Sequence, residues 1–328
     1  MILVTGANGF LGSYICRKLL KEQFPFIAMV RPSSDLSLLE DILENITIHE
    51  GDILDTESFT TVLEEVDDII HCAAIVSYNA KDRQKMNEVN IAGTRNIVNL
   101  ALTNPNKYFI HVSSVAALGR NKHSGRVDEN NKWENSKWNT SYGESKYLAE
   151  LEVWRAIMEG LNAVIINPSV ILGPGNWDKS SAKLFKYVWN EKPFYTSGVL
   201  NYVDVRDVAD IVFKLLNKRV SGERYIINAD NIPIKDFFEK IASAFNKKAP
   251  RIKANGFLLK LARMSQSIKS LFTGSSPTIT RETARVGDSK IYFDNSKIKS
   301  ELNHNFVTLS NTINWTCEFY LKKNLTKN

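Results

Sequence analysis

Tyr142 and Lys146 stand four residues apart in the segment YGESK. Residues with this spacing share one face of a helix, so the two side chains are neighbours if the segment is helical. A phenol has a pKa of about 10 and is a poor base at neutral pH, but a nearby ammonium group stabilises the phenolate. The pair can therefore give a proton to a substrate oxygen or take one from it.

A glycine-rich loop follows the first apolar run of the chain and opens an amphipathic stretch. Gly6 permits a tight turn, Gly9 lets the backbone approach a pyrophosphate, and Gly12 allows the helix to pack closely on the strand. The helix N-terminus then presents free N–H groups to the anion. The residues expected to line this phosphate site are Gly6, Asn8, Gly9, Phe10, Leu11 and Gly12.

Short apolar runs alternate with longer amphipathic stretches through the first 170 residues. The apolar runs are rich in Val and Ile on both faces, as in a parallel sheet that is buried on both sides. They are residues 2–5, 26–30, 46–50, 68–72, 108–113 and 163–167, and the helical stretches are residues 10–21, 56–65, 83–103 and 141–159. This alternation predicts an α/β fold with a Rossmann-type doubly wound parallel sheet.

The rhythm changes after Pro168. Residues 168–200 carry Gly173-Pro174-Gly175 and an aromatic-rich stretch, a strand–helix unit returns at 201–216, and a further strand is expected at 224–228. Beyond Asp230 the pattern is mainly helical. We therefore predict a Rossmann domain made of residues 1–167 and 201–229. Residues 168–200 and 230–328 are predicted to form a smaller, mainly helical substrate-binding lobe.

The composition is that of an ordinary globular protein, with 328 residues, 43% of them hydrophobic and 24% charged. The length fits about two domains. Lys and Arg number 42 against 36 Asp and Glu, a net charge of only +6. The basic residues are scattered, so nucleic-acid binding is not expected.

The cysteines and the N-terminus bear on the compartment. Cys16, Cys72 and Cys317 are few, odd in number and widely spaced, which argues against a disulfide framework or a zinc site. The first residues carry no basic, cleavable signal, and no stretch reaches about 20 uncharged apolar residues. These features predict a cytoplasmic protein without stable membrane insertion.

The GxxGxxG spacing after Thr5, with Phe10 at the start of the helix, resembles the extended branch of the short-chain dehydrogenase/reductase superfamily. That branch is the NAD-dependent epimerase/dehydratase family, and the YxxxK motif also matches it. The Val30-Arg31 strand end and residues 169–174 look most like its dihydroflavonol reductase-like subgroup. The motifs cover about the first 175 residues. The resemblance implies a small-molecule substrate, and it allows a homodimer because some members of the family are dimers.

The end of the second predicted strand indicates which nicotinamide cofactor binds. In an NAD-binding Rossmann unit an acid at this point holds the adenosine ribose hydroxyls. Here the chain reads Arg31-Pro32-Ser33-Ser34, and no acid comes before Asp35. A guanidinium pairs bidentately with a phosphate, so Arg31 favours NADP(H), while NAD(H) stays possible.

The resemblance also implies roles for three residues near the chemistry. In this family the Tyr142 and Lys146 positions carry the proton transfer, and the lysine reaches the nicotinamide ribose. The hydroxyl five residues before Gly119 is Ser114, which would hold the substrate carbonyl oxygen. Ser114, Tyr142 and Lys146 are therefore the predicted catalytic residues.

Further cofactor contacts follow from the resemblance. They are Asp52 and Ile53 at the adenine, Ala73 and Ala74 beneath the cofactor, Asn90 as a backbone tie and Ser113 as a backbone neighbour, with Pro168 and Val170 beside the nicotinamide carboxamide. His71 and Cys72 suggest a metal or a nucleophile, but at a buried strand end without a third ligand nearby in sequence they are expected to be structural. No metal site is predicted.

Three reactions are compatible with this family. Dehydration needs acids just after the catalytic hydroxyl, where Val115 and Ala116 stand instead. A nucleotide-sugar epimerase needs a retained NAD⁺, against which Arg31 speaks. We therefore expect an NADP(H)-dependent oxidoreductase that reduces a carbonyl or oxidises the alcohol. The alternatives are the epimerase and a non-catalytic NADP(H)-sensing protein.

The substrate lobe is less informative. Several mostly apolar residues could be walls of a substrate pocket or ordinary core: Ile75, Val76, Tyr78, Val115, Leu118 and Tyr195. Residues 255–272 have an amphipathic pattern. They form either a helix packed on the smaller lobe or one at a membrane surface or over an oily substrate.

Overall fold

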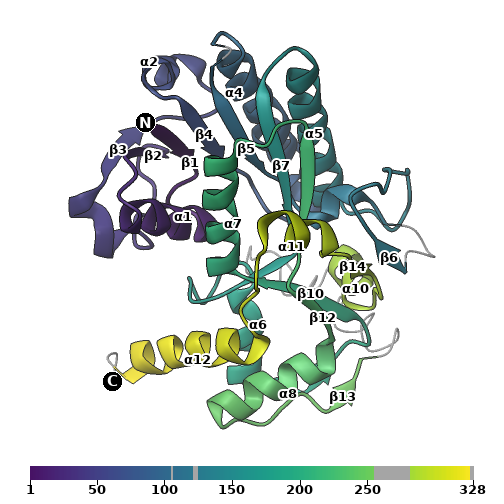
Figure 1. The fold of residues 1–328 in the computed structure, drawn as a ribbon. Helices are drawn as coiled ribbons and strands as arrows, with labels where there is room; N and C mark the ends of the chain where they lie inside the picture. Colours follow the sequence, from purple (N-terminus) through teal and green to yellow (C-terminus); the bar gives the residue numbers. More distant parts are fainter. Residues whose placement is uncertain (105, 121–124, 255–280, 326–328) are drawn as a thin grey trace.

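A computed structural model of the protein describes residues 1–104, 106–120, 125–254 and 281–325 (Figure 1). Its centre is a parallel sheet of seven strands in the order β11-β7-β5-β4-β1-β2-β3. The strands are β1 (Ile2–Thr5), β2 (Phe26–Val30), β3 (Thr47–Glu50), β4 (Asp68–His71), β5 (Tyr108–Val112), β7 (Asn162–Pro168) and β11 (Glu223–Ile227). This is the doubly wound order, and it confirms the predicted fold class.

Helices cover both faces of this sheet because both faces of its strands are apolar. One face packs against α1 (Phe10–Lys21) and α7 (Val205–Lys218). The other face packs against α2 (Thr60–Glu65), α4 (Gly93–Ala101) and α5 (Ser141–Met158). The helices therefore leave only the strand ends open, and a ligand site in such a sheet lies at the carboxyl ends.

The predicted helix over residues 83–103 is interrupted. It consists of α3 (Arg83–Asn87), a wider π-helical turn (Glu88–Ala92) and α4. Asn90 lies in the wide turn with its side chain only 1% exposed, and its amide holds the backbone of Ile75. A π-turn re-aims side chains within a helix, and here it coincides with the inward turn of a polar residue.

The smaller lobe has its own sheet, in the order β12-β10-β8, made of β8 (Val170–Leu172), β10 (Val199–Asp204) and β12 (Asp230–Pro233). Most of β10, from residue 201 on, falls in the part of the chain predicted for the Rossmann domain, whereas α7, directly after it, packs on α1. The chain thus crosses from one layer to the other at Asp204. The division into two domains stays a prediction.

Three helices pack on the smaller sheet: α6 (Ala182–Trp189), α8 (Ile234–Phe245) and α12 (Leu309–Leu325). The described residues also form the strand pairs β6 (Arg126–Val127) with β14 (Tyr292–Phe293) and β9 (Phe194–Tyr195) with β13 (Ile252–Lys253), and the helices α10 (Arg281–Gly287) and α11 (Ser296–Leu302). The expected helical C-terminal region is present, beneath the carboxyl ends of the large sheet (Figure 1).

Across the described ranges, no helix is long and apolar enough to cross a membrane. The amphipathic stretch 255–272 falls outside the described residues.

Candidate active site

The N-terminus of α5 lies against the turn that follows β5, and this contact brings the first two predicted catalytic residues together. The Thr140 hydroxyl caps α5 by accepting a hydrogen bond from the Gly143 N–H at 2.9 Å. A Cβ on Gly143 would lie 2.7 Å from the Ala116 carbonyl oxygen, so only glycine allows this approach. Ser114 caps the same turn, accepting from the Ala116 N–H at 3.2 Å. The Tyr142 phenol comes close enough to the Ser114 side chain for Ser114 to act on the pKa of the phenol.

The Tyr142 phenol sits in a largely dry position, with its side chain 8% exposed. Burial raises its pKa, the neighbouring Tyr78 acts in the same direction, and the Ser114 side chain opposes both. The Tyr78 and Tyr142 rings meet edge to face with centroids 6.1 Å apart. The phenol is therefore protonated at neutral pH and ready to donate.

Lys146 lies one turn further along α5, and its side chain is 3% exposed. Its Nζ donates a hydrogen bond to the Val112 carbonyl at 2.7 Å, at the end of β5. Burial lowers the pKa of Lys146 to about 8, while the carboxylate of Glu150 acts to raise it. At pH 7 the lysine thus carries a positive charge on the helix face that it shares with Tyr142.

The glycine-rich loop fits a dinucleotide. Gly6 has a φ of +66°, which favours glycine, and an added Cβ would lie 2.8 Å from the Ala73 backbone. At Gly12 a Cβ would lie 2.2 Å from the Gly6 carbonyl oxygen. The N-terminus of α1 has no side-chain cap, so its first N–H groups are open to an anion. The tight turn and close packing expected of Gly6 and Gly12 are present. Binding of a cofactor phosphate at this loop stays a prediction.

Two buried polar atoms lie at the carboxyl end of β7 and just beyond it. Asn167 Oδ1 and Ser169 Oγ are among the buried side-chain atoms of the described residues that have no hydrogen-bond partner. Buried polar atoms normally have partners, so a ligand amide would satisfy them. The two residues flank Pro168 and alternate with Val170, which stand where the sequence predicts contact with the nicotinamide carboxamide. An amide oxygen that accepts and a hydroxyl that can donate or accept fit the carboxamide of a nicotinamide cofactor.

Arg31 lies directly after β2 and is exposed. In the described part of the chain, no carboxylate pairs with it. The Asp35 carboxylate instead accepts a hydrogen bond from the Ser37 N–H at 3.0 Å and lies 3.8 Å from Lys179 Nζ. The loop backbone is held to the glycine-rich loop, because the Asn8 side chain donates to the Asp35 carbonyl at 3.1 Å.

The other predicted cofactor residues make contacts with the protein itself at the strand ends. Asp52 accepts a hydrogen bond from the Leu54 N–H at 3.0 Å in the turn after β3. Ile53 is 5% exposed and packs where a Cβ on Gly93 would clash. Ala73 donates its N–H to the Thr5 hydroxyl at 3.2 Å. Their contacts with a cofactor stay predictions.

Asn90 connects the segment after β4 to α5. Its Oδ1 accepts from the Ile75 N–H at 2.7 Å, and its Nδ2 donates to the Ile75 carbonyl at 3.0 Å and to the Ser145 hydroxyl at 2.9 Å. Ala74, two residues after Cys72, is exposed on this segment. The backbone tie predicted for Asn90 is therefore present.

His71 serves as a link between β1 and α4. Its ring nitrogens lie 2.8 Å from the Thr5 hydroxyl and 3.0 Å from the Thr94 hydroxyl, and burial lowers its pKa to about 3. Burial raises the pKa of the Cys72 thiol, so it is not a reactive thiolate. No group of three or more possible metal ligands occurs within the described residues.

Some residues predicted to line a substrate pocket are buried in a core, and others lie near Tyr142 or are exposed. Val115 and Leu118 pack in a small core with Phe293, and Leu118 is fully buried. Tyr78 faces Tyr142 and can border a substrate. Val76 is 58% exposed on the same segment. Tyr195, in β9, packs at the edge of the smaller lobe's core.

The motifs missed one buried charged residue on α5 itself, Glu150. Glu150 is one turn beyond Lys146 and is 1% exposed. It accepts hydrogen bonds from the Ser113 hydroxyl and the Asn167 amide, both at 2.5 Å. The signal was available, because Tyr142, Lys146 and Glu150 follow one another at intervals of four on a single helix face.

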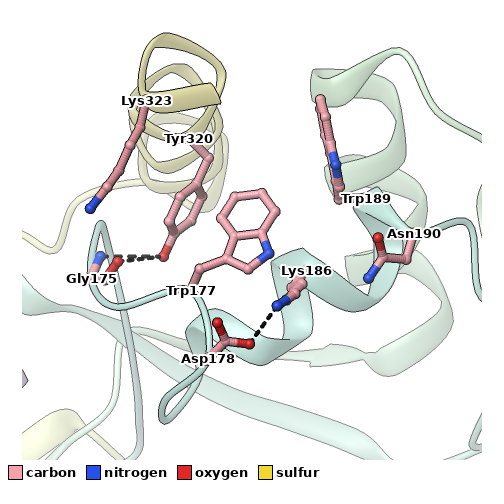
Figure 2. Close-up of a pocket in the computed structure, with 8 residues that line it drawn as sticks. All are labelled: Gly175, Trp177, Asp178, Lys186, Trp189, Asn190, Tyr320 and Lys323. Atoms are coloured by element: carbon pink, nitrogen blue, oxygen red, sulfur yellow. Dashed lines mark hydrogen bonds and ion pairs between the residues drawn. The ribbon is translucent and has the colours of Figure 1, made fainter. Parts of the chain in front are cut away.

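A separate pocket lies in the smaller lobe (Figure 2). Its lining residues are Gly175, Trp177, Asp178, Lys186, Trp189, Asn190, Tyr320 and Lys323, and no predicted site residue is among them. The Tyr320 hydroxyl lies 3.2 Å from the Gly175 nitrogen and 3.3 Å from its oxygen. On the other side of this loop, a Cβ on Gly175 would touch Phe10, so the loop separates the pocket from the cofactor cradle.

The model of the NAD-dependent epimerase/dehydratase family matches residues 2–229. The chain belongs to this family. A protein of Synechocystis sp. that carries a provisional dihydroflavonol 4-reductase name is 30% identical over 310 residues, covering 91% of this chain and 88% of the relative. Cinnamoyl-CoA reductase 1 of Petunia hybrida is 28% identical over 260 residues, covering 75% and 77%.

Solved structures agree with the fold. The crystal structure of gox2253 superposes with a TM-score of 0.83 at 30% identity, covering 98% of both chains. The dTDP-glucose 4,6-dehydratase of Bacillus anthracis, solved in complex with NAD, has a TM-score of 0.77 at 20% identity, covering 99% of this chain and 97% of that one. The protein is thus an NAD(P)-dependent oxidoreductase of the extended short-chain dehydrogenase/reductase type, as the sequence predicted, and it acts on a small-molecule substrate.

Proposed function

We propose that the protein is an NADP(H)-dependent carbonyl reductase, able to run in reverse as an alcohol dehydrogenase, with Ser114, Tyr142 and Lys146 as its catalytic residues. The observation that carries this proposal is the approach of the Tyr142 phenol to the Ser114 side chain, which acts on the pKa of the phenol, with the buried Lys146 one turn further along α5. The names of the relatives, a dihydroflavonol 4-reductase and a cinnamoyl-CoA reductase, support a reductase.

Each of the three residues has a distinct task in reduction. Ser114 hydrogen bonds the substrate carbonyl oxygen and holds it beside the Tyr142 phenol. A nicotinamide cofactor, when bound, supplies the hydride that reaches the carbonyl carbon. Tyr142 gives its proton to the oxygen, which yields the alcohol, and the Lys146 ammonium stabilises the phenolate that remains.

Arg31 supports the choice of NADP(H). It is exposed at the end of β2, where the adenosine ribose lies in Rossmann domains, and in the described ranges it has no carboxylate partner. A free guanidinium at this position suits a 2′-phosphate. The Asp35 carboxylate, which could otherwise hold ribose hydroxyls, accepts from the Ser37 N–H and faces Lys179.

Thermal shift with NADP⁺, NADPH, NAD⁺ and NADH tests the cofactor, together with release of any co-purified nucleotide by denaturation. We expect stabilisation by the phosphorylated pair, little retained nucleotide, and NADPH consumption in a screen of aromatic and aliphatic carbonyl compounds. Tightly retained NAD⁺ and turnover of a nucleotide sugar would instead establish an epimerase. Stabilisation by NADPH with no turnover of either substrate class would establish a sensing protein.

A further inference from the structure

We propose that Glu150 is a positioning residue of the active site, which fixes the strand ends beside Ser114 and keeps Lys146 charged. Glu150 stands on α5 one turn beyond Lys146, and its side chain is nine-tenths or more buried. None of the roles proposed for Ser114, Tyr142 and Lys146 involves Glu150. This inference rests on the proposed function, because it assigns Glu150 to the same site.

One carboxylate oxygen of Glu150 accepts hydrogen bonds from residues of two strand segments. Glu150 Oε1 accepts from the Ser113 hydroxyl, at the end of β5, and from Asn167 Nδ2, in β7, both at 2.5 Å. The second hydrogen of Asn167 Nδ2 goes to the Ser114 carbonyl at 2.9 Å. Glu150 thus fixes the position of the Asn167 side chain, and that side chain hydrogen bonds the backbone of Ser114. A shift at Glu150 would therefore move the hydroxyl that faces Tyr142.

The other carboxylate oxygen faces a cation from a different strand. Glu150 Oε2 lies 3.3 Å from Arg224 Nη1, in β11, and the Arg224 guanidinium also lies over the Trp154 ring. Burial raises the pKa of Glu150, and Arg224, Ser113, Asn167 and Lys146 act against that rise. The Arg224 guanidinium and the Asn167 Nδ2 group can only donate hydrogen bonds. These contacts favour the ionised carboxylate over the protonated acid.

Three charged groups act on one another here, two on α5 and one on β11. Arg224 is positive, Glu150 negative and Lys146 positive, and they are the charged groups that bear on the carboxylate. Burial alone favours a neutral lysine. The Glu150 carboxylate acts against this, and it is the largest influence that raises the pKa of Lys146. An ionised Glu150 thus extends to higher pH the range in which Lys146 can stabilise a phenolate.

The test compares Glu150→Gln with wild type by the pH dependence of kcat and by competitive acetylation of Lys146, read by mass spectrometry without turnover. In wild type both should change near pH 8, where Lys146 loses its proton. Without the carboxylate, the Lys146 midpoint should fall by about one pH unit. The kcat at pH 7 should fall by about 10- to 100-fold, because the reacting groups are misplaced, with NADPH affinity changed much less.

Glu152→Gln is the matched control. Glu152 lies on the same helix two residues away, but it pairs with Arg95 at 2.8 Å and with Arg155 at 3.2 Å, away from the site. We expect this variant to keep the wild-type pH profile. A midpoint in Glu150→Gln equal to that in Glu152→Gln, with unchanged kcat, would overturn the proposal.

Glu150→Asp separates charge from position and serves if the glutamine variant does not fold. It keeps the negative charge but retracts it by one methylene, so the Lys146 midpoint should stay near wild type while kcat falls. A loss of thermal stability in this variant with unaltered kcat would mean that Glu150 is only structural. Turnover retained by Tyr142→Phe would reject the proposed function alone, since the acetylation midpoint still measures the effect of Glu150 on Lys146.

Discussion

The carboxyl edge of the large sheet and the core of the smaller lobe are both buried, but different interactions hold them. At the sheet edge, polar groups on β5, β7, β11 and α5 meet around one carboxylate, Glu150. In the smaller lobe, rings from distant segments meet edge to face, with the Trp177 and Tyr320 centroids 4.0 Å apart and those of Phe185 and Phe237 6.1 Å apart.

This difference suggests that the sheet edge mainly serves catalysis and that the core of the smaller lobe mainly serves stability. Buried polar groups cost free energy unless each is paired, so a cluster such as that around Glu150 has few acceptable arrangements and can hold reacting atoms in place. Aromatic packing is less directional and contributes mainly buried apolar area. Changes at the sheet edge should therefore affect turnover first, and changes in the smaller lobe should affect stability first.

The largest effect is expected for Tyr142→Phe, which removes one hydroxyl from the sheet edge. Turnover should fall by about 10²- to 10⁴-fold, because the proton donor is lost, while the Kd for NADPH measured by fluorescence stays near wild type. Tyr147→Phe is the control, since Tyr147 is on the same helix but stacks on Trp133 at 4.5 Å. Activity of Tyr142→Phe within tenfold of wild type would contradict the assignment of Tyr142.

Gly12→Ala should disturb cofactor binding and stability together. The new Cβ would lie 2.2 Å from the Gly6 oxygen and 2.9 Å from Ala7 Cα, and backbone atoms cannot move aside cheaply. We expect a loss of about 1–3 kcal/mol in the free energy of unfolding and NADPH binding weakened by more than about tenfold. In Gly125→Ala the Cβ meets nothing within 4 Å, and both quantities should be unchanged.

Arg31→Asp tests an exposed residue at the carboxyl edge of the large sheet, directly after β2. Replacing the guanidinium by a carboxylate should lower the ratio of kcat/KM for NADPH to that for NADH by about 10- to 100-fold, since a charged hydrogen bond is lost and a repulsion is added. Arg251→Asp changes the charge of an exposed arginine in the smaller lobe and should leave the ratio as it is. An unaltered ratio in Arg31→Asp would mean that Arg31 does not select the cofactor.

The smallest effect is expected from Tyr320→Phe in the smaller lobe. It keeps the ring but removes the hydroxyl that hydrogen bonds the backbone of Gly175. Urea unfolding should show a loss of about 1 kcal/mol, with turnover within about twofold of wild type. Tyr292→Phe, at an exposed position, should change neither. A large loss of turnover in Tyr320→Phe would show that the two regions are coupled through the Gly175 loop.

Local patterns predicted much of the large sheet. The runs at residues 2–5 and 26–30 became β1 and β2 with those bounds, because buried parallel strands are apolar on both faces and end sharply at turns. The spacing of Gly6, Gly9 and Gly12 predicted the cradle, because its geometry depends on residues close together in the chain. The π-turn at Asn90 was missed, since a single extra residue in a helical turn leaves the periodicity almost unchanged.

The contacts of Glu150 could not be predicted from sequence patterns. Its partners Ser113, Asn167 and Arg224 lie 37, 17 and 74 residues away along the chain, and no periodicity connects them. Leu118 was a candidate pocket wall, yet it is fully buried with Phe293 from the far end of the chain. Whether an apolar side chain lines a pocket or fills a core depends on what arrives from elsewhere.

The sequence alone determined the parallel sheet, the glycine-rich loop and the Tyr142–Lys146 face of α5, because each of these depends on neighbours within one or two turns or strands. Only the tertiary structure decided that β10 pairs in the smaller sheet, that Glu150 contacts residues of three neighbouring strand segments, and that the Gly175 loop lies between Phe10 and Tyr320. These contacts join segments far apart in the chain, and such pairs form only after the whole fold has brought the segments together.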